Sequence, residues 1–291
     1  MFLFRLRLIQ TDLNQSSMKN SKTVLLPLIA LLFLLAIACK KKGSPGSSEG
    51  PEVLPVTPTA PTNPGAEVKA LVPLSISTNN LKIDFQYATT GNILTEIRQS
   101  NGSREMIFYN DKNQLKEYKR YLKDELLYHV YYVLNNEGLV SKGIQYTVEA
   151  GGKLITPIGF YQVSYNEEKQ IETVDWYDFK NMLIETREFS YNEKALFTGS
   201  KTSGTKAFNK NYLYDDQSGI FKQVPLLQIL SLEHEEFYIL NVKANLKSIK
   251  IEGQPAGDLN FEMQYNANGY PTTITRTDAV GKSKIYKMSY R

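Results

Sequence analysis

The stretch Phe261-Glu-Met-Gln-Tyr-Asn-Ala-Asn-Gly-Tyr-Pro-Thr-Thr-Ile-Thr-Arg276 has the pattern of a β-hairpin. Apolar and polar residues alternate up to Tyr265, as in a strand with one apolar face and one polar face. Asn266 can accept hydrogen bonds from the backbone that follows it, and Gly269 can adopt a positive φ. These two residues predict a type I turn closed by a G1 bulge, and a two-residue Asn-Gly turn is the alternative.

Degenerate copies of this hairpin recur from Leu71 to the last residue. When the copies are aligned on the residue before the turn, this anchor is Tyr or Leu in all nine, and the residue two positions earlier is always apolar. The mean spacing of the anchors is about 25 residues, enough for two strands and two turns. The anchors are Tyr87, Tyr109, Leu134, Tyr165, Tyr191, Tyr214, Leu240, Tyr265 and Tyr290.

The order of strand and turn signals predicts the fold class. Turns after the anchors alternate with a second set, such as Asn101-Gly102, at intervals of about a dozen residues. This indicates an all-β domain, an antiparallel up-and-down meander of about 16 to 18 strands. A barrel of that size is too wide for its own side chains to fill. The sequence therefore leaves open a porin-like barrel, one that closes around an inserted segment, and a flattened or curled sheet.

Residues 1–38 have the features of a signal peptide, with Met18 as the more natural start. The apolar run from Val24 to Ile37 is too short for a comfortable membrane span. The run ends in Leu-Ala-Ile-Ala-Cys39, which resembles a bacterial lipoprotein signal. That resemblance implies that Cys39 is the lipidated first residue of the mature chain. The alternative is an uncleaved anchor followed by a buried thiol.

Residues 39–70 are expected to form the lipidated cysteine and an extended tether rich in Lys, Ser, Pro and Thr. Residues 1–70 carry eight of the 34 basic and four of the 30 acidic residues, which leaves 26 of each for the repeat domain, residues 71–291. The basic character of the chain thus belongs to the signal peptide and tether, so we expect no nucleic-acid partner.

The repeat, best preserved in Tyr265–Ile274, resembles the tyrosine-aspartate hairpin repeats of Rhs-type wall proteins. Together with Cys39, the chain resembles Bacteroidota lipoproteins of unknown function with a porin-like domain. The resemblance covers most of residues 80–291 and implies a lipid anchor in the outer membrane, with no catalytic residues to transfer. Lysines stand after Cys39 where some relatives carry an acidic surface-export signal, so we expect the domain to face the periplasm rather than the cell surface.

Residues with catalytic or metal-binding potential are few. His129 and His234 are the two histidines, and neither has the spacing of a zinc site. Since Cys39 is the single cysteine, we expect no metal, no cofactor and no enzymatic activity.

One stretch could support carbohydrate chemistry. Asp175 and Asp178 flank Trp176-Tyr177, so two carboxylates could lie beside an aromatic platform, as in a carbohydrate-active enzyme. A solvated turn beside a packed tryptophan is the simpler interpretation.

The run Pro225–Leu232 interrupts the repeat with a dense apolar segment. Pro225 suits the first position of a helix, which predicts a helical plug or lid, and a buried strand is the alternative. The weak candidates for ligand contact are Trp176, Tyr177, Leu227 and Leu230.

The functional hypothesis is a non-catalytic envelope lipoprotein whose repeat sheet is a binding or scaffolding module for a glycan, lipid or protein. An integral outer-membrane barrel and a carrier of a hydrophobic ligand are the alternatives. Charged residues four positions before the anchors count against a lipid-facing stripe, because a basic residue at the bilayer midplane costs roughly 2 to 4 kcal/mol. These residues are Glu105, Arg187, Lys210 and Glu236.

Overall fold

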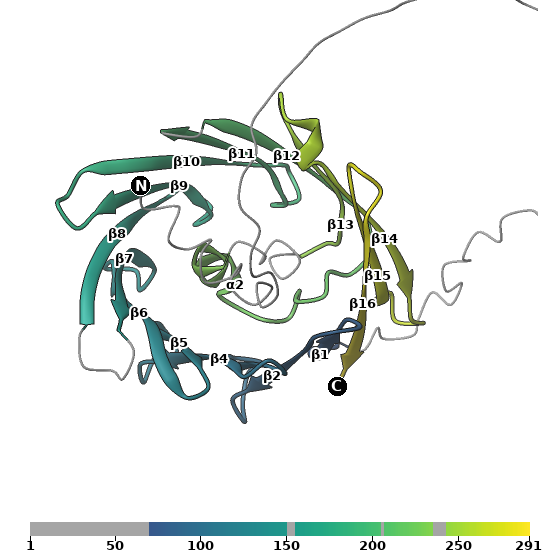
Figure 1. The fold of residues 1–291 in the computed structure, drawn as a ribbon, viewed down its shortest axis with the longest axis horizontal. Helices are drawn as coiled ribbons and strands as arrows, with labels where there is room; N and C mark the ends of the chain where they lie inside the picture. Colours follow the sequence, from purple (N-terminus) through teal and green to yellow (C-terminus); the bar gives the residue numbers. More distant parts are fainter. Residues whose placement is uncertain (1–69, 150–154, 205–206, 235–242) are drawn as a thin grey trace, which may run out of the picture. The chain divides into compact units, whose positions relative to one another are not determined.

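The computed structural model describes residues 70–149, 155–204, 207–234 and 243–291. Sixteen antiparallel strands follow one another around a closed barrel, and β1 pairs with β16 to complete it. Figure 1 shows this ring of strands. The predicted all-β meander is confirmed, and the flattened or curled sheet is wrong. The signal peptide, Cys39 and the tether, together with Glu236 and the anchor Leu240, lie outside the described residues.

The strands differ in length around the barrel, and the longest lie on the β6–β10 side. The odd-numbered strands are β1 (Pro73–Ser77), β3 (Leu94–Gln99), β5 (Leu115–Leu122), β7 (Val140–Val148), β9 (Ile171–Asp178), β11 (Phe197–Gly204), β13 (Leu246–Ile251) and β15 (Pro271–Asp278). The even-numbered strands are β2 (Lys82–Tyr87), β4 (Ser103–Tyr109), β6 (Glu125–Leu134), β8 (Ile155–Tyr165), β10 (Leu183–Tyr191), β12 (Phe208–Tyr214), β14 (Leu259–Tyr265) and β16 (Ser283–Tyr290).

The described anchors end the even-numbered strands, so they gather at one rim, which we name the tyrosine end. Five anchor hydroxyls donate to the carbonyl of the first residue of the preceding strand. These bonds are Tyr87 to Pro73 (2.7 Å), Tyr109 to Leu94 (2.7 Å), Tyr165 to Val140 (2.8 Å), Tyr191 to Ile171 (2.7 Å) and Tyr290 to Pro271 (2.7 Å). Each bond ties two neighbouring strands together through a side chain, in addition to the backbone ladder.

The turn predicted at Asn266 is confirmed in detail. Asn266 Oδ1 accepts hydrogen bonds from the backbone of Asn268 (3.0 Å) and Tyr270 (3.1 Å), and Gly269 has a φ of 74°. The strand register shifts between Gln264 and Tyr265, which is the bulge. The same turn forms where glycine is absent, so Lys169 (φ 59°) and Ala195 (φ 58°) adopt the left-handed conformation.

Between β12 and β13 the chain leaves the wall and enters the barrel. This insert, residues 215–245, contains the short helix α2 (Leu227–Leu230) and the 3₁₀ turn η1 (Ser231–Glu233) in its described part, and Figure 1 shows α2 within the ring. A second 3₁₀ turn, η3 (Pro255–Gly257), connects β13 to β14. The predicted helical plug is confirmed, and the buried strand is wrong.

Pro225 is not the first residue of that helix, contrary to the prediction. The helix starts at Leu227 because Leu226 has a φ of 65°, which turns the chain between the proline and the helix. The base of the insert is closed by Asp215, whose backbone N–H donates to the carbonyl of Asn245 (2.9 Å) and whose carboxylate accepts from the anchor Tyr265.

The apolar stripe of the strands faces inward and packs against the insert. Phe221 meets Phe85 of β2 edge to face at 5.1 Å between ring centroids, and both are buried. On another part of the wall, Gln228 of α2 donates to the hydroxyl of the anchor Tyr191. The insert therefore bridges the interior from β2 to β10. It occupies part of the interior of a barrel that wall side chains alone could not fill.

Candidate functional site

A buried carboxylate fixes the end of the insert to the wall. Glu233 of η1 accepts hydrogen bonds from Tyr128 (2.7 Å) and Tyr161 (2.5 Å), and Tyr132 lies at 3.4 Å. Gln145 donates in turn to the hydroxyl of Tyr128 (2.7 Å). Three wall strands, β6, β7 and β8, thus hold one carboxylate of the insert. A buried carboxylate needs such donors because water no longer solvates it.

A second carboxylate lies next to this group. His234 Nε2 is 3.4 Å from Oε1 of Glu105, which is 1% exposed. Arg120 of β5 donates to the backbone carbonyl of Glu233 (2.7 Å) and to the hydroxyl of Tyr118 (3.3 Å). Residues 233 and 234 therefore interact with β4 and β5 as well as with β6 and β8. The insert ends in a network of two carboxylates, a guanidinium, an imidazole and several tyrosines.

The pKa values of the two carboxyl groups are shifted in opposite directions. Burial raises the pKa of Glu233, and the hydrogen bonds from Tyr161 and Tyr128 and the charge of Arg120 oppose that rise without cancelling it. Burial would also raise the pKa of Glu105, but the hydrogen bond with His234 and the charges of His234 and Arg120 bring it below the ordinary value. One carboxyl thus favours the proton and the other favours the charge, within one network.

The described charged residues four positions before the anchors, Glu105, Arg187 and Lys210, point into the barrel. Glu105 pairs in register with Arg120, and Arg187 pairs with Val174, whose side chain is fully buried. Arg187 also donates to Glu185 (2.6 Å) and lies 4.9 Å from the centre of the Trp176 ring. These charges therefore do not count against a lipid-facing wall, because the stripe that carries them is the inner face of the barrel. Whether the outer face could contact lipid depends on the outward residues, which alternate with this stripe along each strand.

Much of the outer face is polar. From β10 to β16 the exposed outward side chains include lysine, asparagine, glutamine, serine and glutamate. Examples are Glu188, Lys201, Asn209, Asn211, Lys250, Asn260, Glu262, Gln264, Lys287 and Ser289.

The opposite side of the barrel carries aromatic rings on its outer face, and we name Tyr131, Tyr146, Phe160 and Tyr177 the outer aromatic patch. Phe160 and Tyr177 are stacked at 4.8 Å between centroids with an interplanar angle of 13°. Tyr131 is 44% exposed and packs edge to face with Tyr146 at 5.9 Å. Lys142 Nζ lies 3.6 Å from the centre of the Phe160 ring. The patch consists of two pairs of rings, one on β6 and β7 and one on β8 and β9.

Alternation along β9 separates two residues that the sequence placed together as ligand candidates. Tyr177 belongs to the outer aromatic patch, whereas Trp176 faces inward, with its ring 6.1 Å from that of Tyr161. Asp175 accepts from the Thr186 hydroxyl (2.6 Å), and Asp178 caps a turn by accepting from the backbone of residues 180 and 182. The two carboxylates thus have separate structural partners rather than a shared platform.

The other two ligand candidates lie inside the barrel. Leu227 is 4% exposed and Leu230 is 1% exposed, both within the core that the insert forms with the wall. An external ligand could reach them only if the insert moved. Sequence reasoning missed the network around Glu233, because the wall residues that bind Glu233, from Tyr161 to Arg120, are 72 to 113 positions away from it in the chain.

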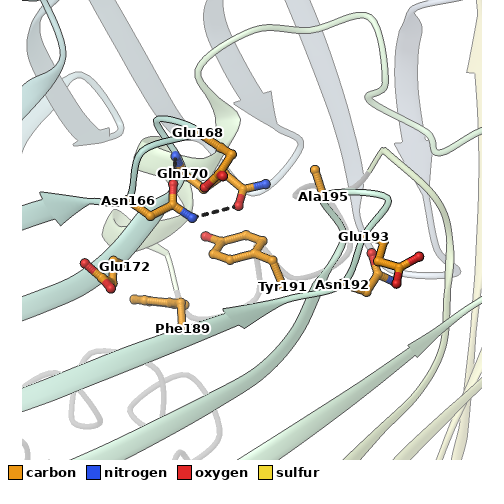
Figure 2. Close-up of a pocket in the computed structure, with 9 residues that line it drawn as sticks. All are labelled: Asn166, Glu168, Gln170, Glu172, Phe189, Tyr191, Asn192, Glu193 and Ala195. Carbon is orange, nitrogen blue, oxygen red and sulfur yellow. Dashed lines mark hydrogen bonds between the residues drawn. The ribbon is translucent and has the colours of Figure 1, made fainter.

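A hollow of about 390 Å³ opens at the tyrosine end, beside the turns that follow β8 and β10. Figure 2 shows Tyr191 between the Asn166–Gln170 pair and the turn at Asn192, with Phe189 and Glu172 below it. Asn166 donates to the Gln170 side chain (3.0 Å). The Tyr191 hydroxyl donates to the carbonyl of Ile171 and accepts from Gln228. These three lining residues thus serve the turns and the insert.

Within the described ranges, no group of three or more His, Cys, Asp or Glu side chains is placed to hold a metal ion. His129 instead lies on the outer face with Nε2 3.1 Å from Glu117, which also pairs with Lys119 at 2.7 Å. None of the helices in the described part of the chain has the length and hydropathy of a membrane-spanning helix.

Comparison with known proteins gives structural neighbours only. No family model matches the chain, and no curated protein does. A porin-like protein from Bacteroides uniformis ATCC 8492 is 13% identical, with a TM-score of 0.48 over 72% of this chain and 91% of that one. A porin-like protein from Bacteroides vulgatus ATCC 8482 is 10% identical, with a TM-score of 0.34 over 76% of this chain and 99% of that one. The TcdB2-TccC3-TEV structure is 10% identical, with a TM-score of 0.17 over 70% of this chain and 15% of that one.

Such low identities assign no function to this chain. The closed barrel itself agrees with the porin-like expectation. The lipid anchor at Cys39 and the relation to Rhs-type repeats stay predictions.

Proposed function

We propose that the protein is a non-catalytic lipoprotein of the cell envelope, held to the outer membrane through Cys39 on the periplasmic side. Its barrel serves as a scaffold, and the outer aromatic patch is its binding surface. The observation that carries the proposal is that the described part of the insert packs inside the barrel against its wall. Because α2 and Glu233 occupy part of the interior, we place the binding surface on the outer face.

The polarity of the wall supports a barrel that faces water. A membrane barrel needs an apolar band about 25 Å tall around its whole circumference. Here the outward residues of β10 to β14 include Lys201, Lys250 and Glu262. Strands β2 and β13 have six residues each, which at about 3.3 Å per residue reach only about 20 Å. The short polar wall thus fits a domain held beside the membrane.

Aromatic rings on an outer face pack against the faces of sugar rings, and tyrosine hydroxyls add polar contacts. A glycan is therefore the ligand class that the outer aromatic patch favours. Soluble peptidoglycan fragments, titrated against the protein by calorimetry, provide a direct probe. Tyr177→Ala should weaken binding at least tenfold, whereas Trp176→Phe should leave it unchanged because that ring faces inward. Equal affinity of all three proteins would exclude the patch as the glycan site.

Two other functions remain open to the same chain. The closed barrel with sixteen strands favours an integral outer-membrane barrel, since bacterial membrane barrels have even strand numbers. The apolar interior favours a carrier of a hydrophobic ligand, provided that the insert can leave it. Native mass spectrometry of the purified protein would reveal a bound lipid in the carrier.

Fractionation separates the lipoprotein from the integral barrel. Labelled palmitate should be incorporated into the wild-type protein and not into Cys39→Ala. A form of the mature chain without the cysteine, exported by a cleavable signal peptide, should appear in the aqueous periplasmic fraction. If that form stays in the membrane after an alkaline wash, the barrel itself is integral and the proposal fails.

A further inference from the structure

One hairpin of the barrel ends in six consecutive exposed residues, Phe179-Lys-Asn-Met-Leu-Ile184. We name this segment the apolar tip. Phe179 is 52% exposed, Met182 65% and Leu183 57%. The first ladder pair between β9 and β10 joins Leu183 to Tyr177, so residues 178–182 extend beyond the paired strands. Phe179 and Met182 therefore project from the end of the wall, and Leu183 lies at this first pair of the ladder.

Other described turns at the same rim, which we name the far end, have a different composition. The β3–β4 turn contains Ser100, Asn101 and Gly102, and the β5–β6 turn contains Lys123 and Asp124. Where an exposed apolar residue occurs it is single, as with Leu122 (37%) next to one turn and Val280 (83%) in another. Scattered exposed apolar residues are ordinary on protein surfaces. Four within six positions at one tip are a concentrated feature.

Hydrogen bonds within the turn hold the shape of the tip, and one acidic side chain accepts them. Asp178 Oδ1 accepts from the backbone of Lys180 (2.8 Å) and Met182 (2.9 Å), and Asn181 takes a φ of 63°. The one acidic group at the turn is thus engaged in shaping it. Lys180 Nζ lies 5.4 Å from the centre of the Phe179 ring, at the edge of the apolar surface. A cation beside apolar side chains suits the boundary between lipid headgroups and acyl chains.

We propose that the apolar tip inserts into the interfacial region of a phospholipid bilayer and orients the barrel on the membrane. The inference rests on the proposed tethering at Cys39, because the tether keeps the domain at the surface. At about 3.3 Å per residue, residues 39–70 can reach roughly 100 Å, so either end of the barrel can meet the bilayer. A narrow projecting turn offers too little area for the broad interface of a stable protein complex, which favours lipid as its occupant.

The test uses the predicted mature chain, residues 39–291, with Cys39→Ser so that no lipid chain contributes. Vesicles of phosphatidylethanolamine and phosphatidylglycerol are sedimented with the protein at low ionic strength. The double variant Phe179→Ser/Met182→Ser should partition at least tenfold less than the parent chain. Leu213→Ser is the matched control, because Leu213 is 60% exposed on the outer face of β12, away from the tip. It should bind as the parent does.

A second measurement locates the contact. The chain has one tryptophan, Trp176, which faces inward, so Phe179→Trp adds a reporter at the tip. Lipids brominated on their acyl chains should quench the added fluorescence and leave that of the parent chain nearly unchanged. No sedimentation of the parent chain, or equal partition of all variants, would overturn the proposal. So would a parent dimer that the double variant converts to a monomer, since a second copy would then be the occupant of the tip.

These outcomes are independent of the lipid anchor. Palmitate labelling of Cys39 tests the tether by itself, and it is unaffected by the tip substitutions. A labelled chain with an inactive tip would therefore refute only the insertion of the tip.

Discussion

The turns at the two ends of the barrel differ in how closely they repeat. At the tyrosine end, the same asparagine turn, bulge and anchor recur from hairpin to hairpin, and the anchor hydroxyls tie neighbouring strands together. At the far end the described turns differ from one another, and one of them carries the apolar tip. Inside, the network around Glu233 and Glu105 lies below the anchors, with Glu105 four residues before Tyr109. The turns of the tyrosine end are therefore copies of one repeat, whereas each described turn of the far end has its own sequence.

This difference shows which part of a repeat is constrained by folding. A turn that sets strand register cannot vary freely, because a slip of one residue would expose the apolar stripe. Turns at the opposite rim only need to reverse the chain. They are free to differ in composition, as the apolar tip at Phe179–Ile184 does.

The largest expected effect concerns the insert, which belongs to neither rim. Leu230→Ala should lower the free energy of unfolding by about 2 to 5 kcal/mol, because it leaves a cavity beside a side chain that is 1% exposed. Leu226→Ala in the same segment should cost much less, since Leu226 is 36% exposed. Urea unfolding measures both. Equal losses would mean that the insert does not hold the barrel together.

The second comparison sets a tyrosine of the interior network against a tyrosine of the rim. Tyr161→Phe removes a donor from the buried carboxylate of Glu233 and should cost about 1.5 to 3 kcal/mol. Tyr109→Phe removes a bond to a backbone carbonyl and should cost about 0.5 to 1.5 kcal/mol. The two variants change the same atoms, so denaturation curves can be compared directly. A larger loss of unfolding free energy for Tyr109→Phe would mean that the hydrogen bonds of the rim stabilise the barrel more than those of the interior network.

The third prediction concerns pH. Because the folded pKa of Glu233 is raised above its ordinary value of 4.5, the folded state binds the proton more tightly than the unfolded state. The stability from this group is present below pH 4.5 and is lost as pH rises through the folded pKa. Glu105, with its lowered pKa, has the opposite effect, and only at more acidic pH.

Glu233→Gln should therefore remove a loss of stability that the wild-type protein shows as pH rises above 4.5. Tyr128, Tyr161 and Arg120 remain in place in this variant, so thermal unfolding across the pH range isolates the carboxyl. Parallel stability curves for the two proteins would contradict the assignment.

The smallest effect is expected in a turn of the tyrosine end. Ala195 has a φ of 58°, which costs a residue with a Cβ roughly 1 kcal/mol more than glycine. Ala195→Gly should thus stabilise the protein by about that amount, and Gly269→Ala, in the equivalent turn, should destabilise it similarly. If both substitutions destabilise the protein, the contacts of Ala195 outweigh its backbone strain.

Much of the tyrosine end was predictable from sequence. The alternation around Met263 and Tyr265 and the Asn-Gly spacing predicted strand, bulge and inner face, because each depends on neighbours within a few residues. The strand count was predictable for the same reason. The separation of Trp176 from Tyr177 also follows from alternation, although both residues were predicted as ligand contacts of one site.

The candidate site was less predictable. The outer aromatic patch combines residues of four strands whose mutual register is set by three separate turns. The apolar tip was visible as a run of residues, yet its exposure depends on where the β9–β10 ladder ends. Pairing across strands, rather than local preference, decides both.

The sequence by itself determined a meander of anchored hairpins with one apolar face, since turn chemistry and a period of two are local properties of the chain. Only the tertiary structure decided that β1 meets β16 and that the apolar face lies inside. It also decided that Glu233 is held by Tyr128 and Tyr161. The physical reason is that closure and the burial of a charge depend on contacts between residues far apart in the chain. Such contacts form only when the whole barrel surrounds the insert.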